Sequence, residues 1–156
     1  MQPGEDPTAA IERAALRLLA RREYAQGELY KRLVEYRGFP ADAVERVLQA
    51  LASKGLLDDG RYRVARLRSR QSRGQGPLLV ARDWRRAGAE PQDRLLEEVD
   101  WLSVALASLR KRFGTQSPQD ARERARRARF LQNRGFAADT IRQALRIAEA
   151  EEEDSA

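Results

Sequence analysis

An internal repeat with a period near 50 residues constrains the fold of this 156-residue chain more than any other feature. Three times, a helical pattern runs into a basic residue or alanine, then a glycine, then a new amphipathic segment; the glycines are Gly38, Gly88 and Gly135. Val44 and Ile141 stand at the same offset from the first and third of these glycines. Repeats of this length made only of helical patterns are typical of small helix bundles that bury their apolar faces partly against one another. The repeat therefore predicts an all-α fold of three tandem three-helix repeats forming an elongated, curved array.

The domain boundaries follow from the turn residues and from the charge at the chain ends. Pro3, Gly4 and Pro7 indicate a loose start, and acidic residues gather after position 148. We expect a disordered N-terminus over 1–9, three-helix repeats over 10–55, 56–100 and 101–148, and an acidic tail over 149–156.

Periodic apolar positions and turn signals predict nine helices, over 8–21, 26–37, 41–54, 58–73, 78–87, 91–100, 101–113, 120–133 and 139–149. The second is expected to bury Leu29, Leu33 and Tyr36. At the start of the fourth, Asp58 can cap the free amides of the first turn, and Asp59 lies at the positive end of the helix dipole.

The composition argues against most enzyme classes. The chain has no histidine and no cysteine, so it lacks the common zinc ligands, the thiol nucleophile and the imidazole base. The glycine-rich stretch from Gly74 to Pro77 follows a helix and carries no phosphate-binding lysine. No apolar run is long enough for a signal peptide or a membrane span. We expect a cytoplasmic protein that is not an enzyme, with no cofactor and no metal.

The net charge of +6 is unevenly distributed. Nine arginines face one acid between Arg61 and Arg86, and nine basic residues face two acids between Arg110 and Arg134. At 100° per residue, one side of the fourth helix collects its arginines within an arc of about 80°. These are Arg63, Arg66, Arg70 and Arg73, and one side of the eighth helix carries Arg122, Arg126 and Arg129. Arginine is also simply the common basic residue of this chain, at 27 of 30, but the segregation of the two rows favours a polyanionic partner.

Several motifs resemble the RecX family, whose members regulate the RecA recombinase. The most specific is the stretch from Gly55 to Tyr62, which matches a signature of glycine, hydrophobic pair, two aspartates, any residue, arginine and aromatic; its polar and aromatic members here are Asp58, Asp59, Arg61 and Tyr62. Supporting matches lie at 22–29, 74–88 and 131–136. The chain departs from the family at Ala25, where serine is common, so a capping box with Glu28 is incomplete.

The resemblance implies a non-enzymatic regulator, mainly an inhibitor, that takes part in DNA repair, homologous recombination and the SOS response. Such a protein would bind the RecA filament on single-stranded DNA and suppress filament growth, strand exchange and ATP hydrolysis. Its partners would be the RecA filament and the DNA phosphate backbone, without base specificity and without a membrane.

Two other functions fit the residue pattern. A helix-turn-helix-like DNA-binding protein with no recombinase partner is also built from three-helix units with a basic helix. Such a protein usually reads bases from the exposed start of one helix, whereas arginines here run along two whole helices, which favours tracking of phosphates or of an acidic groove. A structural scaffold would tolerate reversal of the arginine charges.

Overall fold

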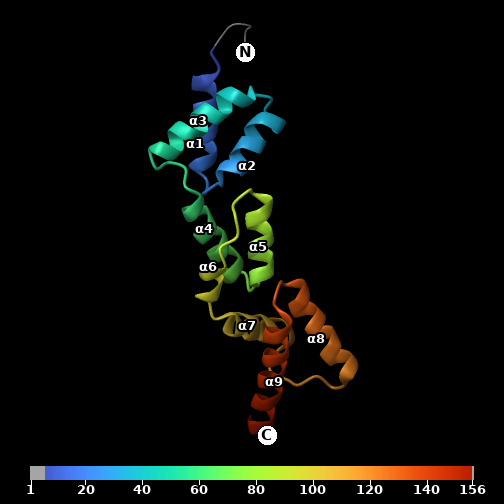
Figure 1. The fold of residues 1–156 in the computed structure, drawn as a ribbon. Helices are drawn as coiled ribbons and strands as arrows, with labels where there is room; N and C mark the ends of the chain where they lie inside the picture. Colours follow the sequence, from blue (N-terminus) through green and yellow to red (C-terminus); the bar gives the residue numbers. More distant parts are fainter. Residues whose placement is uncertain (1–5, 156) are drawn as a thin grey trace. The chain divides into compact units, whose positions relative to one another are not determined.

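The computed structural model describes residues 6–155, and within that range the chain is helical with no β-strand. The helices are α1 Thr8–Leu19, α2 Gln26–Lys31, the π-helical turn η1 Arg32–Tyr36, α3 Ala41–Ser53, α4 Asp59–Ser72, α5 Pro77–Arg86, α6 Asp93–Glu97, α7 Trp101–Phe113, α8 Ala121–Asn133 and α9 Ala138–Ser155 (Figure 1). The all-α prediction is therefore confirmed for the described residues. No helix among them is long and apolar enough to cross a membrane.

The chain divides into two compact units. The first holds the described residues up to Ala65 together with Asp83–Pro91, and the second holds Arg66–Arg82 together with the described residues from Gln92 onward. Helices α4 and α5 therefore contribute residues to both units.

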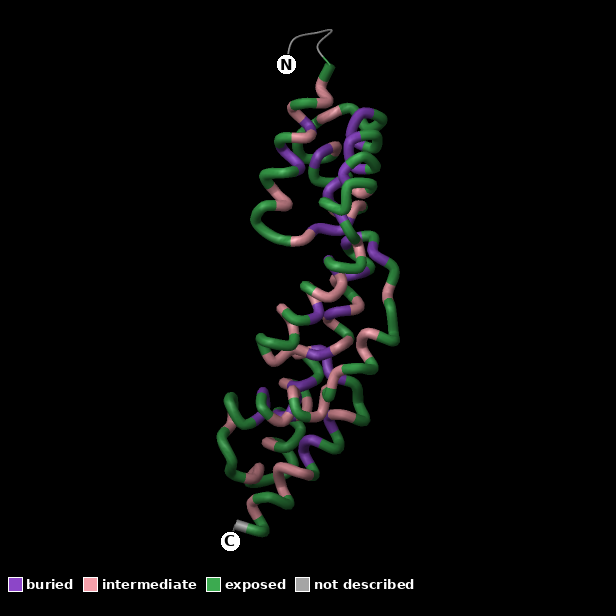
Figure 2. The backbone as a smooth tube through the Cα atoms, turned by 90° about the vertical axis from the view of Figure 1, so that its left-hand side faces the viewer, coloured by how far each residue is buried: buried purple, intermediate pink, exposed green. Residues whose placement is uncertain are grey.

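The core of the first unit is formed by α1, α2, η1 and α3. Ile11, Leu29, Leu33, Val44 and Leu48 are almost completely buried in one apolar cluster. Buried positions recur at helical spacing along the backbone, with exposed turns between them (Figure 2). Burial of such side chains contributes about 1.5 to 3 kcal/mol each, which is what holds these short helices together.

The prediction that Tyr36 is buried is wrong, since its side chain is 78% exposed. The N–H of Arg37 bonds to the carbonyl of Arg32, five residues back, so the last turn is wider than an α-helical turn. The wider turn rotates the following positions, and Phe39 packs partly against the core instead. The predicted left-handed glycine caps are present at Gly38 and Gly55, with φ of 73° and 75°.

Two aromatic residues connect α4 to α5 inside the first unit. Tyr62 and Trp84 are buried, and the indole N–H of Trp84 donates to the carbonyl oxygen of Arg63 at 3.2 Å. The hydroxyl of Tyr62 donates to the carbonyl oxygen of Asp83 at 3.4 Å. Trp84 is therefore a core anchor with its polar atom satisfied.

The core of the second unit lies among α7, α8 and α9. Leu109, Leu131, Phe136 and Leu145 form its buried centre. Phe113 and Phe130 meet edge to face at its border, with ring centroids 5.3 Å apart.

Two glycine turns meet in the second unit and fix the elements around the site described below. The N–H of Gly76 donates to the carbonyl oxygen of Arg134 at 2.7 Å, and the N–H of Leu78 donates to that of Gly135 at 3.0 Å. A Cβ on Gly76 would collide with the backbone of Gly135. Gly27 packs in a similar way in the first unit, where an added Cβ would lie 3.0 Å from the carbonyl oxygen of Ala87.

The chain ends are more helical than predicted. Helix α1 begins at Thr8, inside the segment expected to be disordered, and residues 1–5 of that segment lie outside the described residues. Helix α9 extends to Ser155, through the expected acidic tail. Glu149 pairs with Arg124 at 2.7 Å, and Glu151 pairs with Arg110, so these carboxylates contact the body of the second unit.

Candidate functional site

The four signature residues all stabilise the first unit. Asp58 accepts a hydrogen bond of 2.9 Å from the N–H of Arg61, which confirms the predicted cap of α4 and holds the pKa of Asp58 below its ordinary value. Asp59 accepts one of 2.8 Å from the N–H of Gln26, the first residue of α2. The guanidinium of Arg61 donates to Glu23 and to the carbonyl oxygen of Gly55, at 3.0 and 2.7 Å. With Tyr62 buried, the signature is explained by capping and packing.

The arginines predicted to form a row on α4 differ in their surroundings. Arg63, Arg66 and Arg70 are half-buried, whereas Arg73 is exposed. The Nε of Arg63 donates to the carbonyl oxygen of Glu90 at 2.8 Å, and Arg70 donates to the side-chain oxygen of Gln75 at the same distance. Arg63 and Arg70 thus hold neighbouring segments in place, whatever else they bind.

The arginines predicted on α8 are all exposed. Arg122, Arg126 and Arg129 line one shallow depression of about 500 Å³. Asp120 and Glu123 line it too and offset part of the positive charge. The N–H of Gln119 bonds to Glu123 at 2.9 Å and lowers the pKa of that carboxyl.

A neighbouring arginine, Arg127, is buried, and the sequence gave no sign of it. Its guanidinium donates to the carbonyl oxygen of Gln116 at 2.7 Å and to Glu123 at 3.1 Å, and it lies over the ring of Phe113. Its Nε has no hydrogen-bond partner. Because α8 carries arginine on several sides, no apolar stripe marks which one faces inward.

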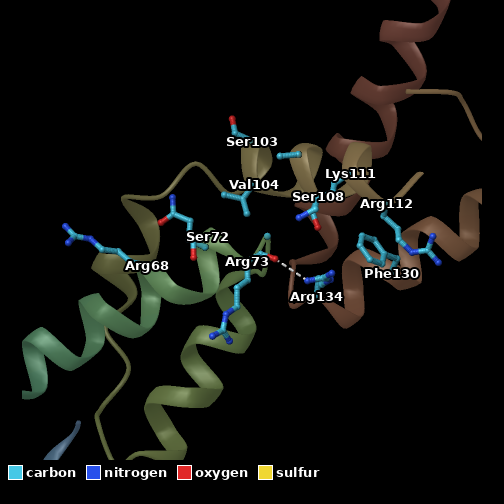
Figure 3. A pocket seen from close by; sticks show the side chains of 13 residues that line it. Arg68, Ser72, Arg73, Ser103, Val104, Ser108, Lys111, Arg112, Phe130 and Arg134 are labelled. Atoms are coloured by element: carbon cyan, nitrogen blue, oxygen red, sulfur yellow. Dashed lines mark hydrogen bonds between the residues drawn. The ribbon is translucent and has the colours of Figure 1, made fainter. Parts of the chain in front are cut away.

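The most strongly basic feature of the second unit is a cleft of about 710 Å³ between the end of α4, α7 and the end of α8 (Figure 3). Five cationic side chains line it, and no acidic residue does; they are Arg68, Arg73, Lys111, Arg112 and Arg134. Four of the five are exposed, and the half-buried Arg134 donates to the carbonyl oxygen of Arg73 at 3.2 Å. Arg68 and Arg112 reach away at opposite sides of the view. We call this feature the basic cleft.

The rest of the basic cleft is apolar or carries neutral hydrogen-bonding groups. Val104, Ala107 and Phe130 supply carbon surface. Ser72, Ser103 and Ser108 supply hydroxyl groups. Gly74 lies against Ser108, since a Cβ on Gly74 would come within 3.2 Å of the hydroxyl oxygen. Small residues thus keep one wall of the cleft low.

Of the predicted binding residues, only Arg73 lines the basic cleft. Its partners were missed, although they fall within the two basic stretches recognised in the sequence. The missed signal was the charge of the stretches themselves, because the helical-face analysis treated each helix alone. Residues 68 and 134 come together only through the tertiary fold.

The chemistry available is recognition of anions. The described residues contain no group of His, Cys, Asp or Glu side chains that could hold a metal ion. Guanidinium groups donate forked hydrogen bonds to phosphate or carboxylate, and a cleft lined by one sign of charge concentrates ligands of the opposite sign.

Comparisons with known proteins agree along nearly the whole chain. Two family models match, "RecX, first three-helix domain" over residues 13–51 and "RecX, third three-helix domain" over residues 98–145. The chain is 47% identical over 148 residues to the regulatory protein RecX of Halorhodospira halophila, covering 92% of this chain and 91% of the relative. It is 50% identical over 140 residues to that of Acidithiobacillus ferrooxidans, covering 90% and 89%.

Solved structures show the same fold. The crystal structure of RecX from Lactobacillus salivarius superimposes with a TM-score of 0.72 at 17% identity, covering 93% of this chain and 98% of the other. A second crystal structure, of regulatory protein RecX, gives 0.68 at 20% identity, covering 89% and 73%.

Proposed function

Because this chain belongs to the RecX family, we propose that it regulates the RecA recombinase by binding the RecA filament on single-stranded DNA. Binding suppresses filament growth, and with it strand exchange and ATP hydrolysis. The regulation is not catalytic, in keeping with a sequence that lacks histidine and cysteine.

The observation that carries this proposal is the basic cleft. A surface with five cations and no acid suits the phosphates of DNA in a filament, because each neutralised phosphate releases counterions. Arg122, Arg126 and Arg129 add a second basic surface on α8 in the same unit. Arg63, Arg66 and Arg70 remain candidates on α4 at which a structural role is combined with binding.

The second candidate is a helix-turn-helix-like DNA-binding protein that acts without a recombinase. Three-helix domains are compatible with it. The exposed face of α8, however, carries arginines along its length, and arginine at successive turns contacts phosphates more readily than it selects a base sequence.

Co-sedimentation separates the two candidates. RecA filaments are assembled on single-stranded DNA with a slowly hydrolysed ATP analogue, and the labelled protein is added. We expect the protein to pellet with filaments and to bind bare DNA and DNA-free RecA more weakly. Equal binding to bare duplex DNA, with none to filaments, would favour the second candidate and reject the first.

A further inference from the structure

We infer that the basic cleft holds an unpaired nucleotide of single-stranded DNA, with the cations binding its phosphates and the apolar wall receiving its base. The inference rests on the proposed function in that it places the protein at single-stranded DNA. It adds the site, and it adds a preference for strands whose bases are free.

The charge of the cleft selects an anion. Arg68, Arg73, Lys111 and Arg112 are exposed, so their charged groups reach a ligand from solvent. They come from two helices and the turn after α4, with residues 68 and 73 on one side and residues 111 and 112 on α7. Cations on both sides of a cleft can contact successive phosphates of one strand.

The apolar wall selects a base. Phe130 is half-buried, and its edge-to-face contact with Phe113 keeps its ring in place at the cleft. The guanidinium of Arg134 lies 5.2 Å from the centre of the Phe130 ring, which adds a second flat group at the same spot. Nucleobases stack on aromatic rings and on guanidinium planes without regard to sequence.

The size of the cleft fits this ligand. Its volume of about 710 Å³ falls within the range of pockets that enclose small organic groups. A duplex keeps its bases stacked inside the helix and presents mainly phosphates to such a cleft, whereas a single strand can turn a base inward. An acidic peptide would satisfy the cations but would leave the aromatic wall without a flat partner.

The test uses the full chain and measures anisotropy with labelled oligonucleotides. The probes are a short thymidine oligonucleotide, an abasic oligonucleotide of the same length, and a duplex. We expect the thymidine strand to bind at least about five-fold more tightly than the abasic strand, since stacking of one base is worth at least this factor.

Two pairs of variants place the effect in the cleft. Arg68→Ala with Lys111→Ala removes two cations of the cleft, and Arg142→Ala with Arg146→Ala removes two exposed cations of α9 outside it. The cleft pair should lower the slope of log affinity against log salt by about 1.4, at about 0.7 per phosphate contact on a single strand. The α9 pair should leave the slope unchanged.

The second pair tests the base. Phe130→Leu keeps apolar bulk in the cleft but removes the aromatic face, while Phe113→Leu alters the other ring of the same contact, which does not line the cleft. We expect Phe130→Leu to reduce the preference for thymidine over abasic DNA and Phe113→Leu to preserve it. A loss of folding would affect both probes together, so the ratio of the two affinities reports on the base.

Equal binding of thymidine and abasic strands by the wild-type protein would overturn the inference. So would a polyglutamate peptide that displaces the oligonucleotide as well as unlabelled thymidine does, because the ligand would then be an acidic peptide. These outcomes are distinct from failure of the proposed function: a protein that ignores RecA filaments and still prefers unpaired bases through Phe130 retains the cleft and loses only its recombinase partner.

Discussion

Asp59 caps a helix that begins 33 residues before it, by accepting a hydrogen bond of 2.8 Å from the backbone N–H of Gln26. This contact supplies at the start of α2 a carboxylate where the side chain of Ala25 supplies none. The carboxylate of Glu28, the expected partner in a capping box, is instead held by Arg22 at 2.8 Å. Asp59 thus ties the start of α4 to the first three helices of its unit.

Replacement of Asp59 by alanine should destabilise the protein by about 1 to 2 kcal/mol, because the free amide of Gln26 loses its acceptor. Asp59→Asn retains an acceptor and should lose less than half as much. Urea unfolding followed by circular dichroism measures both. Equal losses for the two variants would show that charge, and not the hydrogen bond, is what matters at this position.

Gly38 and Gly135 occupy equivalent positions in the repeat but have different surroundings. Both have positive φ, at 73° and 91°. No atom lies within 4 Å of a Cβ built on Gly38, whereas one on Gly135 would lie 2.6 Å from Cγ of Leu79. Gly38→Ala should therefore cost only the backbone term, about 1 to 2 kcal/mol.

Gly135→Ala should cost about 1 to 3 kcal/mol more than Gly38→Ala, because the backbone term is joined by overpacking against α5. The comparison of urea midpoints is the measurement. A smaller loss at Gly135 than at Gly38 would mean that the two glycine turns in the second unit can separate freely.

Arg127 and Arg126 are neighbours with opposite roles. The side chain of Arg127 is 5% exposed and holds the carbonyl oxygen of Gln116, so Arg127→Ala should cost about 2 kcal/mol through lost packing and an unsatisfied carbonyl. Arg126 is exposed, and Arg126→Ala should change stability by less than about 0.5 kcal/mol. Thermal melts of the two variants should differ clearly. Similar melting temperatures would place Arg127 at the surface.

Stability should fall in acid through carboxylates that cap helices. The hydroxyl of Ser103 lowers the pKa of Asp100, and the N–H of Arg61 lowers that of Asp58. A carboxyl whose pKa is lower in the folded state stabilises the fold above its unfolded pKa, and this contribution is lost as the pH falls through the folded value. We expect the urea midpoint to drop below about pH 4, the region of an ordinary aspartate.

The double variant Asp58→Asn with Asp100→Asn serves as the control for the acid effect. It should be less stable than the wild type at neutral pH and should show a weaker dependence on pH. A wild-type midpoint that stays constant down to pH values well below 4 would remove these caps as the cause.

Much of the fold could be predicted from local patterns. The glycine caps at Gly38 and Gly55 and the cap at Asp58 act within one helix turn, so the residues that decide them are adjacent in sequence. The turn at η1 could not be predicted, because a single wider turn leaves no trace in apolar spacing. The partner of Asp59 was equally hidden, since nothing local connects residues 26 and 59.

The candidate site was less accessible to sequence reasoning. The concentration of basic residues in two stretches was visible, but a helical projection selected the side of α4 that carries Arg63 and Arg70, which are half-buried. The other side carries Arg68, which lines the basic cleft with residues of α7 and α8. A site built from three helices is set by tertiary packing, which no single-helix pattern contains.

The decisive experiment is to measure ATP hydrolysis by RecA on single-stranded DNA while this protein is titrated at micromolar concentrations. We expect hydrolysis to fall progressively with the wild-type protein. The variant Arg122→Glu with Arg126→Glu and Arg129→Glu should keep its helical dichroism, because these side chains are exposed, and should inhibit much less. Undiminished hydrolysis at every concentration of the wild-type protein would reject regulation of this recombinase, and full inhibition by the charge-reversed variant would remove α8 from the binding surface.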